Sequence, residues 1–500
     1  MPVKVSGEMN NQLDQLFTKE EIAEALAQMC PTKAPGLDGL PAAFFQKHWS
    51  SVNEGVVSTC LHILNEGGNL TLLNHTFIAL VPKVSKPRKV TEFRPINLCN
   101  VIYRIVAKTI ANRLKIVLND IISSNQSAFV PNRLITDNII IGYECLNKIR
   151  QSRGSRNGLI AMKLDISKAY DRVEWSFVKG TMQKLGFSVR LVDLVMNCIS
   201  TASFSVLING VAKGLIHHQR GLRQGCPFSP YLFIMCAKVF SCLLVRAEGQ
   251  NLFHGLKFSR EISVTHRLFA DDSLVFTRAS NAECRELKKV FDYYTAASGQ
   301  IFNYEKSSMF FSSSTSQQLR EEISSIFYLA IVSKHEKYLG LPSMVGRAKI
   351  SFFNDIKLRV LSKLSSWQSK CFSNRGNEVF IKAVAQAVPA YAMSVFKIPQ
   401  TLCGDMEKAI ARFWWGSTRG KRSIHWSSWN RLCQAKTKGG LRFRDISCFN
   451  QALIAKQGWR ILHKPDSLMA KILKAKYFKG AGFMDAKLGS NPSFVWRSIL

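Results

Sequence analysis

The chain has 500 residues, 46% of them hydrophobic and 10% aromatic, which is the composition of a globular protein with a sizeable core and excludes a disordered one. Lys and Arg outnumber Asp and Glu by 68 to 34, so the net charge of +34 favours a polyanionic partner, nucleic acid rather than an anionic membrane surface. No apolar run is expected to span a membrane, since 231–245 is interrupted by Lys238, and the N-terminus lacks the apolar region of a secretory signal.

The first part of the chain is predicted to be mainly helical. Residues 18–29 have Thr18 as N-cap and Glu21 in the position that completes a capping box. A loop rich in Pro and Gly follows over 33–41. Further helices are expected over 42–49, 53–65, 101–120 and 136–150. The polar side of the third of these is expected to carry Arg104, Lys108, Arg113 and Lys115.

A strand over 76–82 leads into the basic loop 83–90. A basic hairpin suits a triphosphate group, although a charge run of this kind is more often a solvated surface.

An apolar strand over 159–164 ends at a carboxylate, Asp165. The stretch 166–175 is expected to turn helical and to continue to Leu185, with Gly186 as C-cap.

The next segment contains turn and glycine signals. Asn209-Gly210 follows a strand and predicts a hairpin. Glycines in the loop 220–230 let the backbone approach a ligand closely. Ser229 is expected to cap, and Pro230 to open, a helix that runs to about residue 246.

Asp271 and Asp272 lie between strand-forming runs at 262–268 and 274–277, which predicts a β-hairpin with two carboxylates at its tip. Like charges on a tight turn require a compensating cation. With Asp165 on the same sheet, the pattern suits two divalent ions about 4 Å apart. Taken alone, an Asp-Asp pair is also ordinary turn chemistry.

The last third is basic and rich in tryptophan. Residues 341–500 hold 28 Lys and Arg against seven Asp and Glu, a net +21, with seven of the nine tryptophans. This composition suits a surface that tracks phosphates and stacks on bases, unless the tryptophans form core. The thirteen cysteines stand alone, which predicts free thiols and no zinc ribbon. Helices are expected over 282–298, 350–366, 377–396 and 402–415, and strand over 301–311.

Seven ordered motifs carry a resemblance that covers nearly the whole chain. The chain resembles the reverse transcriptases of non-LTR (LINE-type) retrotransposons, most closely the plant kind. The motifs are KAPGLDGLPAAFF (33–45), FRPINLCNVIYRIVAKTIANRL (93–114), NQSAFVPNRLITDN (125–138), KLDISKAYDRVEW (163–175), RGLRQGCPFSPYLF (220–233), FADDSLVF (269–276) and KYLGLPS (337–343).

The resemblance implies an α+β fold, the right-hand polymerase with fingers, palm and thumb. The implied parts are an N-terminal extension (1–69), fingers (70–158), a palm with an antiparallel sheet (159–325), a thumb-like helical region (326–420) and a basic C-terminal region (421–500).

The resemblance also implies roles for individual residues. Asp165, Asp271 and Asp272, with the Ile166 carbonyl, would hold two Mg²⁺ ions, for which Mn²⁺ is a possible substitute. Lys306 would protonate the leaving pyrophosphate, unless it is an ordinary strand-edge lysine.

Five further positions match nucleotide-binding residues of the family. Tyr170 matches the steric gate against a ribose 2′-OH, unless it is a core aromatic. Gln224 and Gly225 match the loop that lines the nucleotide and template. Lys83 and Arg94 match the cations that hold the triphosphate.

The implied function is an RNA-directed DNA polymerase that uses an RNA template, a DNA primer and deoxynucleoside triphosphates, with no membrane partner and an expected place in the nucleus. The alternatives are a decayed remnant that only binds nucleic acid and, less favoured, a splicing maturase. Departures from the family pattern at Leu37, Cys226, Phe228 and Arg267 hint at an ageing copy. The family's endonuclease, zinc-binding and RNase H segments are not recognised, which suggests a polyprotein fragment. A charged Arg267 on a buried strand would be costly if unpaired, or would face solvent or nucleic acid.

Overall fold

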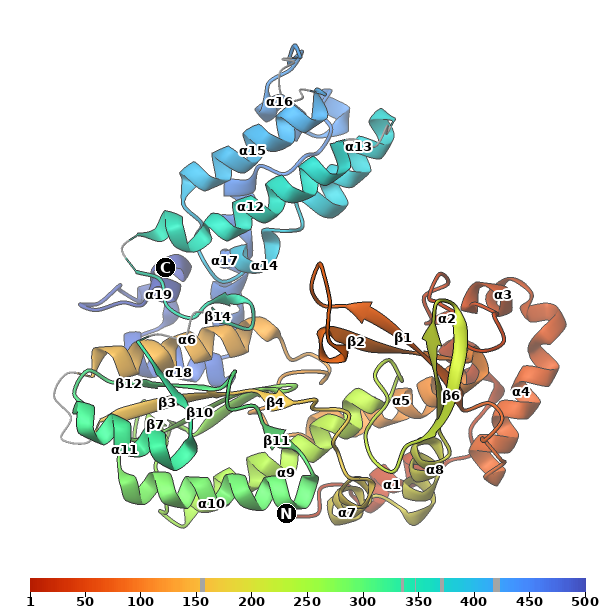
Figure 1. Ribbon diagram of the computed structural model, residues 1–500. Helices are drawn as coiled ribbons and strands as arrows, with labels where there is room; N and C mark the ends of the chain where they lie inside the picture. The colour runs from red at the N-terminus through yellow and green to blue at the C-terminus, as the bar shows by residue number, and fades with distance from the viewer. Residues whose placement is uncertain (153–157, 334–336, 347, 369–372, 417–422) are drawn as a thin grey trace.

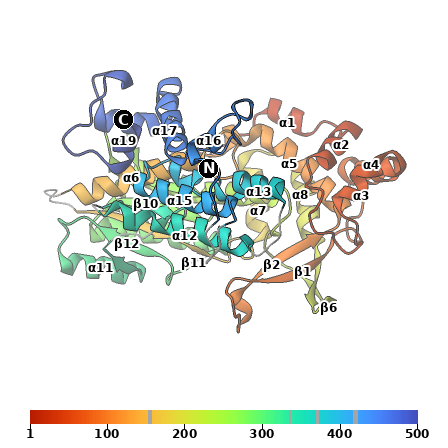
Figure 2. The ribbon, with the colours of Figure 1, turned by 90° about the horizontal axis from the view of Figure 1, so that it is seen from above.

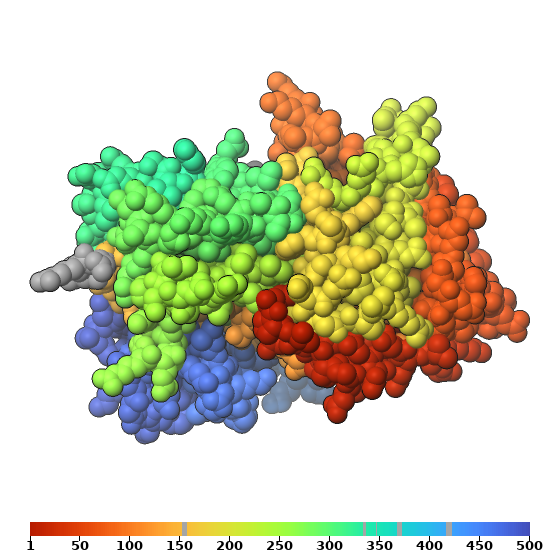
Figure 3. Space-filling model, turned by 90° about the horizontal axis from the view of Figure 1, so that it is seen from below, coloured from red at the N-terminus to blue at the C-terminus, as the bar shows by residue number. Residues whose placement is uncertain are grey.

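The computed structural model describes the chain except residues 153–157, 334–336, 347, 369–372 and 417–422, and its architecture is α+β (Figure 1). The capping box predicted at Thr18 and Glu21 is present and begins α2. The N-terminal helices are α1 (Gly7–Leu13), α2 (Lys19–Ala27), α3 (Ala42–Lys47) and α4 (Trp49–Glu66). In Figure 3, which shows the molecule from below, the N-terminal segment (red) lies against a later part of the chain (yellow). The amides of Lys4 and Val5 both donate to the Leu185 carbonyl of that part.

A four-stranded sheet, here called the hairpin sheet, has the order β2-β1-β5-β6. Its strands are β1 (His75–Pro82), β2 (Phe93–Cys99), β5 (Ser203–Ile208) and β6 (Val211–His217). β1 is antiparallel to β2 and parallel to β5. The predicted turn at Asn209-Gly210 is confirmed, since φ is positive at both residues (51° and 81°).

A five-stranded central sheet has the order β13-β12-β3-β10-β9. Its strands are β3 (Leu159–Leu164), β9 (His266–Phe269), β10 (Asp272–Arg278), β12 (Ser308–Phe311) and β13 (Ala330–Val332). β3 pairs antiparallel with both β10 and β12. Successive residues of β3 are buried in different core clusters, Ile160 and Met162 in one and Ala161 in the other, so both faces of the sheet are covered.

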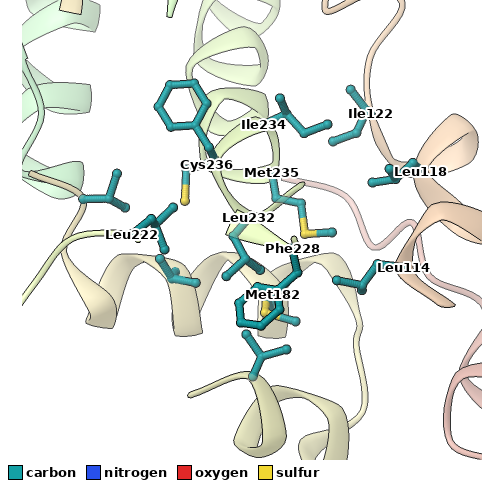
Figure 4. Packing of buried hydrophobic residues seen from close by; sticks show 14 of the residues in the cluster. Leu114, Leu118, Ile122, Met182, Leu222, Phe228, Leu232, Ile234, Met235 and Cys236 are labelled. Atoms are coloured by element: carbon teal, nitrogen blue, oxygen red, sulfur yellow. The ribbon is translucent and has the colours of Figure 1, made fainter. Parts of the chain in front are cut away.

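Helices cover the two faces of the central sheet, α6 (Ile135–Gln151) above it and α9 (Ser229–Gly249) with α10 (Asn281–Ser298) below it (Figure 1). Figure 4 shows Phe228, Leu232 and Met235 at the start of α9 packed towards Leu114 and Met182. By length and composition α9 is the one helix among the described residues that is apolar enough to cross a membrane, although, as noted above, Lys238 interrupts its apolar run. Its most apolar stretch is 56% buried, as in a core helix of a soluble protein.

Shorter elements link these layers. The remaining helices of this part are α5 (Val101–Ile121), α7 (Trp175–Leu185), α8 (Val189–Ser200) and α11 (Gln317–Phe327). The two-stranded pairs are β4 (Ile166–Ser167) with β11 (Ile301–Phe302), β7 (Leu256–Lys257) with β8 (Ser263–Val264), and β14 (Lys337–Tyr338) with β15 (Leu341–Pro342).

The C-terminal helices share one core with the face of the central sheet that α6 covers, and in Figure 2, seen from above, those of residues 349–414 lie over the sheet while those of residues 446–499 lie to one side of it. They are α12 (Lys349–Gln368), α13 (Asn374–Phe380), α14 (Ala390–Met393), α15 (Gln400–Trp414), α16 (Trp429–Cys433), α17 (Ile446–His463), α18 (Leu468–Tyr477) and α19 (Phe494–Ile499). Arg460 binds both carboxylate oxygens of Asp137 on α6 at 2.7 Å. Of the seven late tryptophans only Trp426 and Trp459 are exposed, so the core alternative holds for the other five.

Three local predictions are wrong. The stretch 166–175 forms β4 and a turn, and the helix begins only at Trp175. Arg104 and Arg113 do not lie on a solvated face but are buried. The Arg104 guanidinium donates a hydrogen bond to Ala34 O, and the Arg113 guanidinium donates to the Glu21 carboxylate.

Two further residues differ from expectation. Ser229 does not cap α9: the N-cap is Phe228, and the Ser229 hydroxyl has no hydrogen-bond partner in the described part of the chain. Arg267 faces neither solvent nor an open groove, because it is only 2% exposed. Its guanidinium donates to Asn138 Oδ1, to Ser124 O (2.8 Å) and to Ser127 Oγ (3.1 Å), so this buried charge is well hydrogen-bonded.

Candidate active site

The three predicted metal ligands lie at one end of the central sheet. Asp165 directly follows β3, and Asp272 opens β10. Ser273 pairs with Leu164, so the antiparallel register continues with Asp272 beside Asp165. Asp271 lies in the two-residue turn between β9 and β10, because Asp272 pairs with Phe269. The predicted hairpin with carboxylates at its tip is thus present.

The tip of this hairpin is held by a residue that the sequence did not indicate, Gln126. Ala270 has φ of 53°, a left-handed conformation that is unusual for a residue with a side chain. Its amide donates to Gln126 Oε1 at 3.1 Å, and the same oxygen accepts from Ala128 N at 3.0 Å. Gln126 also forms a parallel bridge with Leu268 on β9, so its segment extends the sheet at the hairpin edge.

The carboxylates repel one another. Burial raises the pKa of Asp165. The nearby Lys306 ammonium partly offsets this shift, and the charge of Asp271 adds to it. Burial likewise raises the pKa of Asp272. Lys163 partly offsets this shift, and the charges of Asp271 and Asp165 add to it. As these side chains stand, no three His, Cys, Asp or Glu groups within the described ranges converge closely enough to form a metal site. The donor set nevertheless fits a hard divalent cation, because three carboxylates at one sheet end carry unneutralised repulsion that such an ion relieves.

Asp165 is fixed from its other side by the segment before β12. Its amide donates to Ser307 Oγ at 3.0 Å, and its carbonyl accepts from Asn303 N at 2.8 Å. The Asn303 side chain also lowers the pKa of the Asp165 carboxyl. Lys306 of this segment is exposed and close enough to affect the pKa of Asp165. Lys306 thus lies near Asp165, while its predicted role as proton donor to the pyrophosphate stays a prediction.

Lys163 is a site residue that sequence reasoning missed. It interacts with both Asp165 and Asp272, and its ammonium donates to Lys337 O at 3.0 Å. The available signal was the strand period of two, which places positions 163 and 165 on one face. Ile166 is buried and pairs with Phe302 across β4 and β11, next to the carboxylates.

The Tyr170 ring has a fixed orientation. It stacks on Phe233 of α9 with centroids 4.7 Å apart and planes 9° apart. Burial, reinforced by the charge of Asp271, raises the pKa of the phenol well above its ordinary value. The Tyr170 carbonyl accepts from Leu222 N at 2.8 Å, which ties this turn to the glycine loop.

The glycine loop packs directly against the turn after β4. A Cβ at Gly221 would lie 2.8 Å from the Asp171 carbonyl, and φ there is 96°, so both the space and the backbone require glycine. Gln224 Nε2 donates to Asp171 Oδ1 at 3.4 Å. Gly225 also has positive φ, of 95°. Gln224 and Gly225 therefore lie on a loop that is bonded to the turn at Tyr170 and Asp171, and their predicted contact with nucleotide and template stays a prediction.

Asp171 links this loop to the hairpin sheet and was not predicted. Burial raises its pKa, while Lys168, Gln224, His218 and Lys83 lower it. Lys83 donates to Thr91 O at 3.0 Å and so is held within its own hairpin. Arg94 pairs with Val81 near the same hairpin end and is exposed. Among the described residues no hydrogen bond or ion pair joins Arg94 to the other predicted site residues.

Comparison with known proteins agrees with this geometry. The chain is 28% identical over 419 residues to the Transposon TX1 uncharacterized 149 kDa protein of Xenopus laevis, an alignment that covers 83% of the chain and 31% of that protein. It is 45% identical over 115 residues to an uncharacterized mitochondrial protein of Arabidopsis thaliana, covering 23% of the chain and 75% of that protein.

A third relative is the Retrovirus-related Pol polyprotein from type-2 retrotransposable element R2DM of Drosophila melanogaster, 26% identical over 299 residues, or 58% of the chain and 27% of the polyprotein. The chain thus spans about a third or less of the two transposon proteins. Residues 81–343, more than half of the chain, match the family model described as reverse transcriptase (RNA-dependent DNA polymerase). The chain therefore belongs to the reverse transcriptase family, in agreement with its resemblance to non-LTR retrotransposon proteins.

Proposed function

We propose that this chain is the RNA-directed DNA polymerase module of a LINE-type retroelement, which extends a DNA 3′-hydroxyl along an RNA template. The observation that carries the proposal is the meeting of Asp165, Asp271 and Asp272 at one end of the central sheet, where burial, with a smaller contribution from the neighbouring carboxylates, raises the pKa of Asp165 and of Asp272. Carboxylates so arranged are suited to nucleotidyl transfer with divalent ions.

Asp165, Asp271 and Asp272, with the Ile166 carbonyl, are the groups that would hold two Mg²⁺ ions, or Mn²⁺ in their place. When bound, such ions supply activation of the attacking hydroxyl and stabilisation of the leaving pyrophosphate. The protein contributes a rigid frame, because the hairpin tip is bonded to Gln126 and Asp165 to Ser307 and Asn303.

The nucleotide would lie between the carboxylates and the glycine loop. Tyr170 would contact the sugar and exclude a 2′-hydroxyl, a role that its fixed stack on Phe233 supports. Gln224 and Gly225 would line the base and template. Lys83 and Arg94, at the end of the β1–β2 hairpin, would bind the triphosphate. Lys306 would donate a proton to the departing pyrophosphate, since an exposed ammonium beside Asp165 is within reach of that side of the site.

In the right-hand description, residues 70–158 would act as fingers and residues 159–325, which contain most of the central sheet, as palm, although β5 and β6 of the hairpin sheet fall within the second range. The helical region 326–420 acts as thumb, although its strand β13 joins the central sheet. The regions 1–69 and 421–500 flank this core. The basic C-terminal part contributes two exposed tryptophans that can stack on bases.

The test is primer extension by the purified protein on a poly(rA)/oligo(dT) template with Mg²⁺. We expect DNA product from the wild-type chain and at least a roughly 100-fold lower rate from Asp271→Asn, because a ligand of the ions is lost. Asp355→Asn, which removes an exposed carboxylate elsewhere, is the matched control and should extend normally.

Two results would contradict the proposal. Equal extension by wild type and Asp271→Asn would exclude the assigned site. No extension by the wild type, with salt-sensitive template binding intact, would identify a remnant that binds nucleic acid without copying it.

A further inference from the structure

A large cavity, of about 830 Å³, lies away from the carboxylates. It is enclosed by the C-terminal end of α6, the first turn of α12 and the segment that leads into α19, three elements that meet at the left of Figure 1. The start of α6 is near the carboxylates, because Asn138 donates to Leu268 O at 2.8 Å, two residues before the hairpin tip. Arg150 is twelve residues further along α6, so the cavity is about 18 Å away along the helix axis.

The charged side chains that line this cavity are all cationic: Arg150, Lys349 and Arg497. The neutral amides Gln151 and Asn491 complete its polar lining. No carboxylate lines the cavity among the described residues, and its three cations form no ion pair there. The nearby acid Glu144 is already bonded to Lys476, Tyr477 and Ser493. The site therefore lacks an internal counter-ion.

The cations are held at the rim of the cavity and remain exposed to solvent. Arg150 Nη2 donates to Asn147 Oδ1 at 3.0 Å, and the Lys349 ammonium lies 5.0 Å above the centre of the Phe494 ring. Gln151 Nε2 donates to Asn491 O at 3.2 Å, which joins the two walls. Pre-positioned cations lose little freedom when they bind an anion.

We propose that this cavity binds the phosphodiester backbone of a nucleic acid strand, at a second site remote from the carboxylates. Its volume is near the upper end of that of small-molecule sites, so it exceeds the needs of one inorganic phosphate. Three cations without a carboxylate suit a ligand that carries several negative charges, as the phosphates of a strand do. The inference rests on the charge and shape of the cavity and does not require the chain to be an active polymerase.

A charge-removal variant tests the proposal. Arg150→Gln, Lys349→Gln and Arg497→Gln are combined, and the control combines Lys19→Gln, Lys47→Gln and Lys184→Gln, three exposed cations on α2, α3 and α7. The affinity for a fluorescent single-stranded RNA is measured by anisotropy over a range of KCl concentrations, and again with DNA of the same sequence.

We expect the cavity variant to bind with a salt slope lower by about 2, because each lost phosphate contact removes about 0.7 from the slope for a single strand. The control should keep the wild-type slope. Equal slopes for the two variants would overturn the proposal.

A measurement on the unmodified sequence guards against misfolded variants. Lysines are acetylated with and without RNA and the sites are quantified by mass spectrometry. We expect RNA, or DNA, to protect Lys349 more than Lys47. The proposal would be overturned if inorganic tripolyphosphate protected Lys349 and RNA and DNA did not, or if none of these ligands protected it.

Asp271→Asn separates this inference from the proposed polymerase function. That variant should lose extension and still show protection of Lys349. If it loses the protection as well, the two sites are one and the inference fails.

Discussion

Asp165 and Asp272 have pKa values raised above the ordinary 3.8 by burial, and the neighbouring carboxylates add to the shift. Their protonated forms are favoured in the folded state. The stability that they contribute is therefore complete below pH 3.8 and is lost as the pH rises through their raised pKa values. At neutral pH the metal-free protein carries this penalty in full.

We therefore expect Asp272→Asn to raise the melting temperature of the metal-free protein at neutral pH by about 2 °C, and to have no such effect in acid, where the carboxyl is already neutral. Mg²⁺ should raise the melting temperature of the wild type more than that of the variant. Differential scanning fluorimetry with chelator or Mg²⁺ measures both, with Asp355→Asn as control. A variant less stable than wild type at neutral pH without metal would contradict this account.

Gln126 is the second residue for which the structure makes a sharp prediction. Gln126→Leu removes the acceptor of the Ala128 and Ala270 amides, so the left-handed tip that bears Asp271 loses its support. We expect the free energy of unfolding to fall by about 1–3 kcal/mol. The kcat of primer extension should fall roughly 10-fold or more, with little change in the KM for the nucleotide, because the carboxylates move while the triphosphate contacts remain.

The matched control for Gln126→Leu is Gln46→Leu. Gln46 also makes two hydrogen bonds to backbone, with the Leu26 and Met29 carbonyls, but lies far from the carboxylates. The Gln46→Leu variant should lose as much free energy of unfolding as Gln126→Leu, measured by urea unfolding, while its kcat stays at the wild-type value. If both variants lose kcat equally, Gln126 acts through stability alone.

The sequence indicated residues whose signal is local and missed those whose partners are distant. Asp165 and Asp271 stand out because each interrupts an apolar strand pattern. Arg267 was misread because its acceptors, Asn138 and Ser127, are more than a hundred residues away in the chain. Gln126 was missed for the same reason. No periodicity within one segment reports a hydrogen bond between two segments.

At the scale of elements, strong periodicity predicted most of the long helices, although the one expected over 377–396 is divided into α13, a π-helical turn (Ile381–Ala385) and α14, and short segments were decided by tertiary contacts. α5, α6 and α10 begin and end within a residue or so of the expected bounds. The stretch 166–175 was expected to be helical, yet its backbone groups form hydrogen bonds with neighbouring segments. β11 pairs with β4, and the amides of Gly221 and Leu222 donate to the Val173 and Tyr170 carbonyls. These carbonyls are then unavailable to an α-helix.

One buried carboxylate, Glu144, joins α6 to the C-terminal helices, beside the Arg460–Asp137 pair described above. It is fully buried and accepts from Lys476 and Tyr477 at 2.8 Å, and from Ser493. Glu144→Leu leaves the Lys476 ammonium, only 16% exposed, without its partner. We expect a loss of about 3 kcal/mol in the free energy of unfolding and faster proteolytic cleavage among α17, α18 and α19.

The control for Glu144→Leu is Asp355→Asn, which removes an ion pair whose side chains are 57% and 61% exposed. It should change stability by no more than about 0.5 kcal/mol, because exposed pairs contribute little. Urea unfolding and limited proteolysis with mass mapping give the two readouts. Cleavage of Glu144→Leu at the wild-type rate would show that α6 and the C-terminal helices are held together by other contacts.

At the scale of the whole molecule, the net charge of +34 has two opposite consequences. Without a partner the cations repel one another and destabilise the folded state. With a nucleic acid the same cations supply the affinity. The remote cavity lies at the end of α6, about 18 Å along the helix axis from Asn138, which contacts the strand that leads to the carboxylates, so one strand of moderate length can contact both sites.

These two consequences predict salt effects of opposite sign. Added KCl should raise the melting temperature of the free protein, because it screens the repulsion. The same salt should lower the melting temperature of the RNA complex. Bound RNA stabilises the folded protein by an amount that grows with its affinity, and this affinity falls as the salt concentration rises. The two curves should therefore converge as KCl rises. An uncharged peptide nucleic acid of the same sequence is the control and should leave the free-protein curve unchanged. If the curves with and without RNA rise in parallel, the charge does not act through phosphate binding, and the positive surface must be explained by another partner.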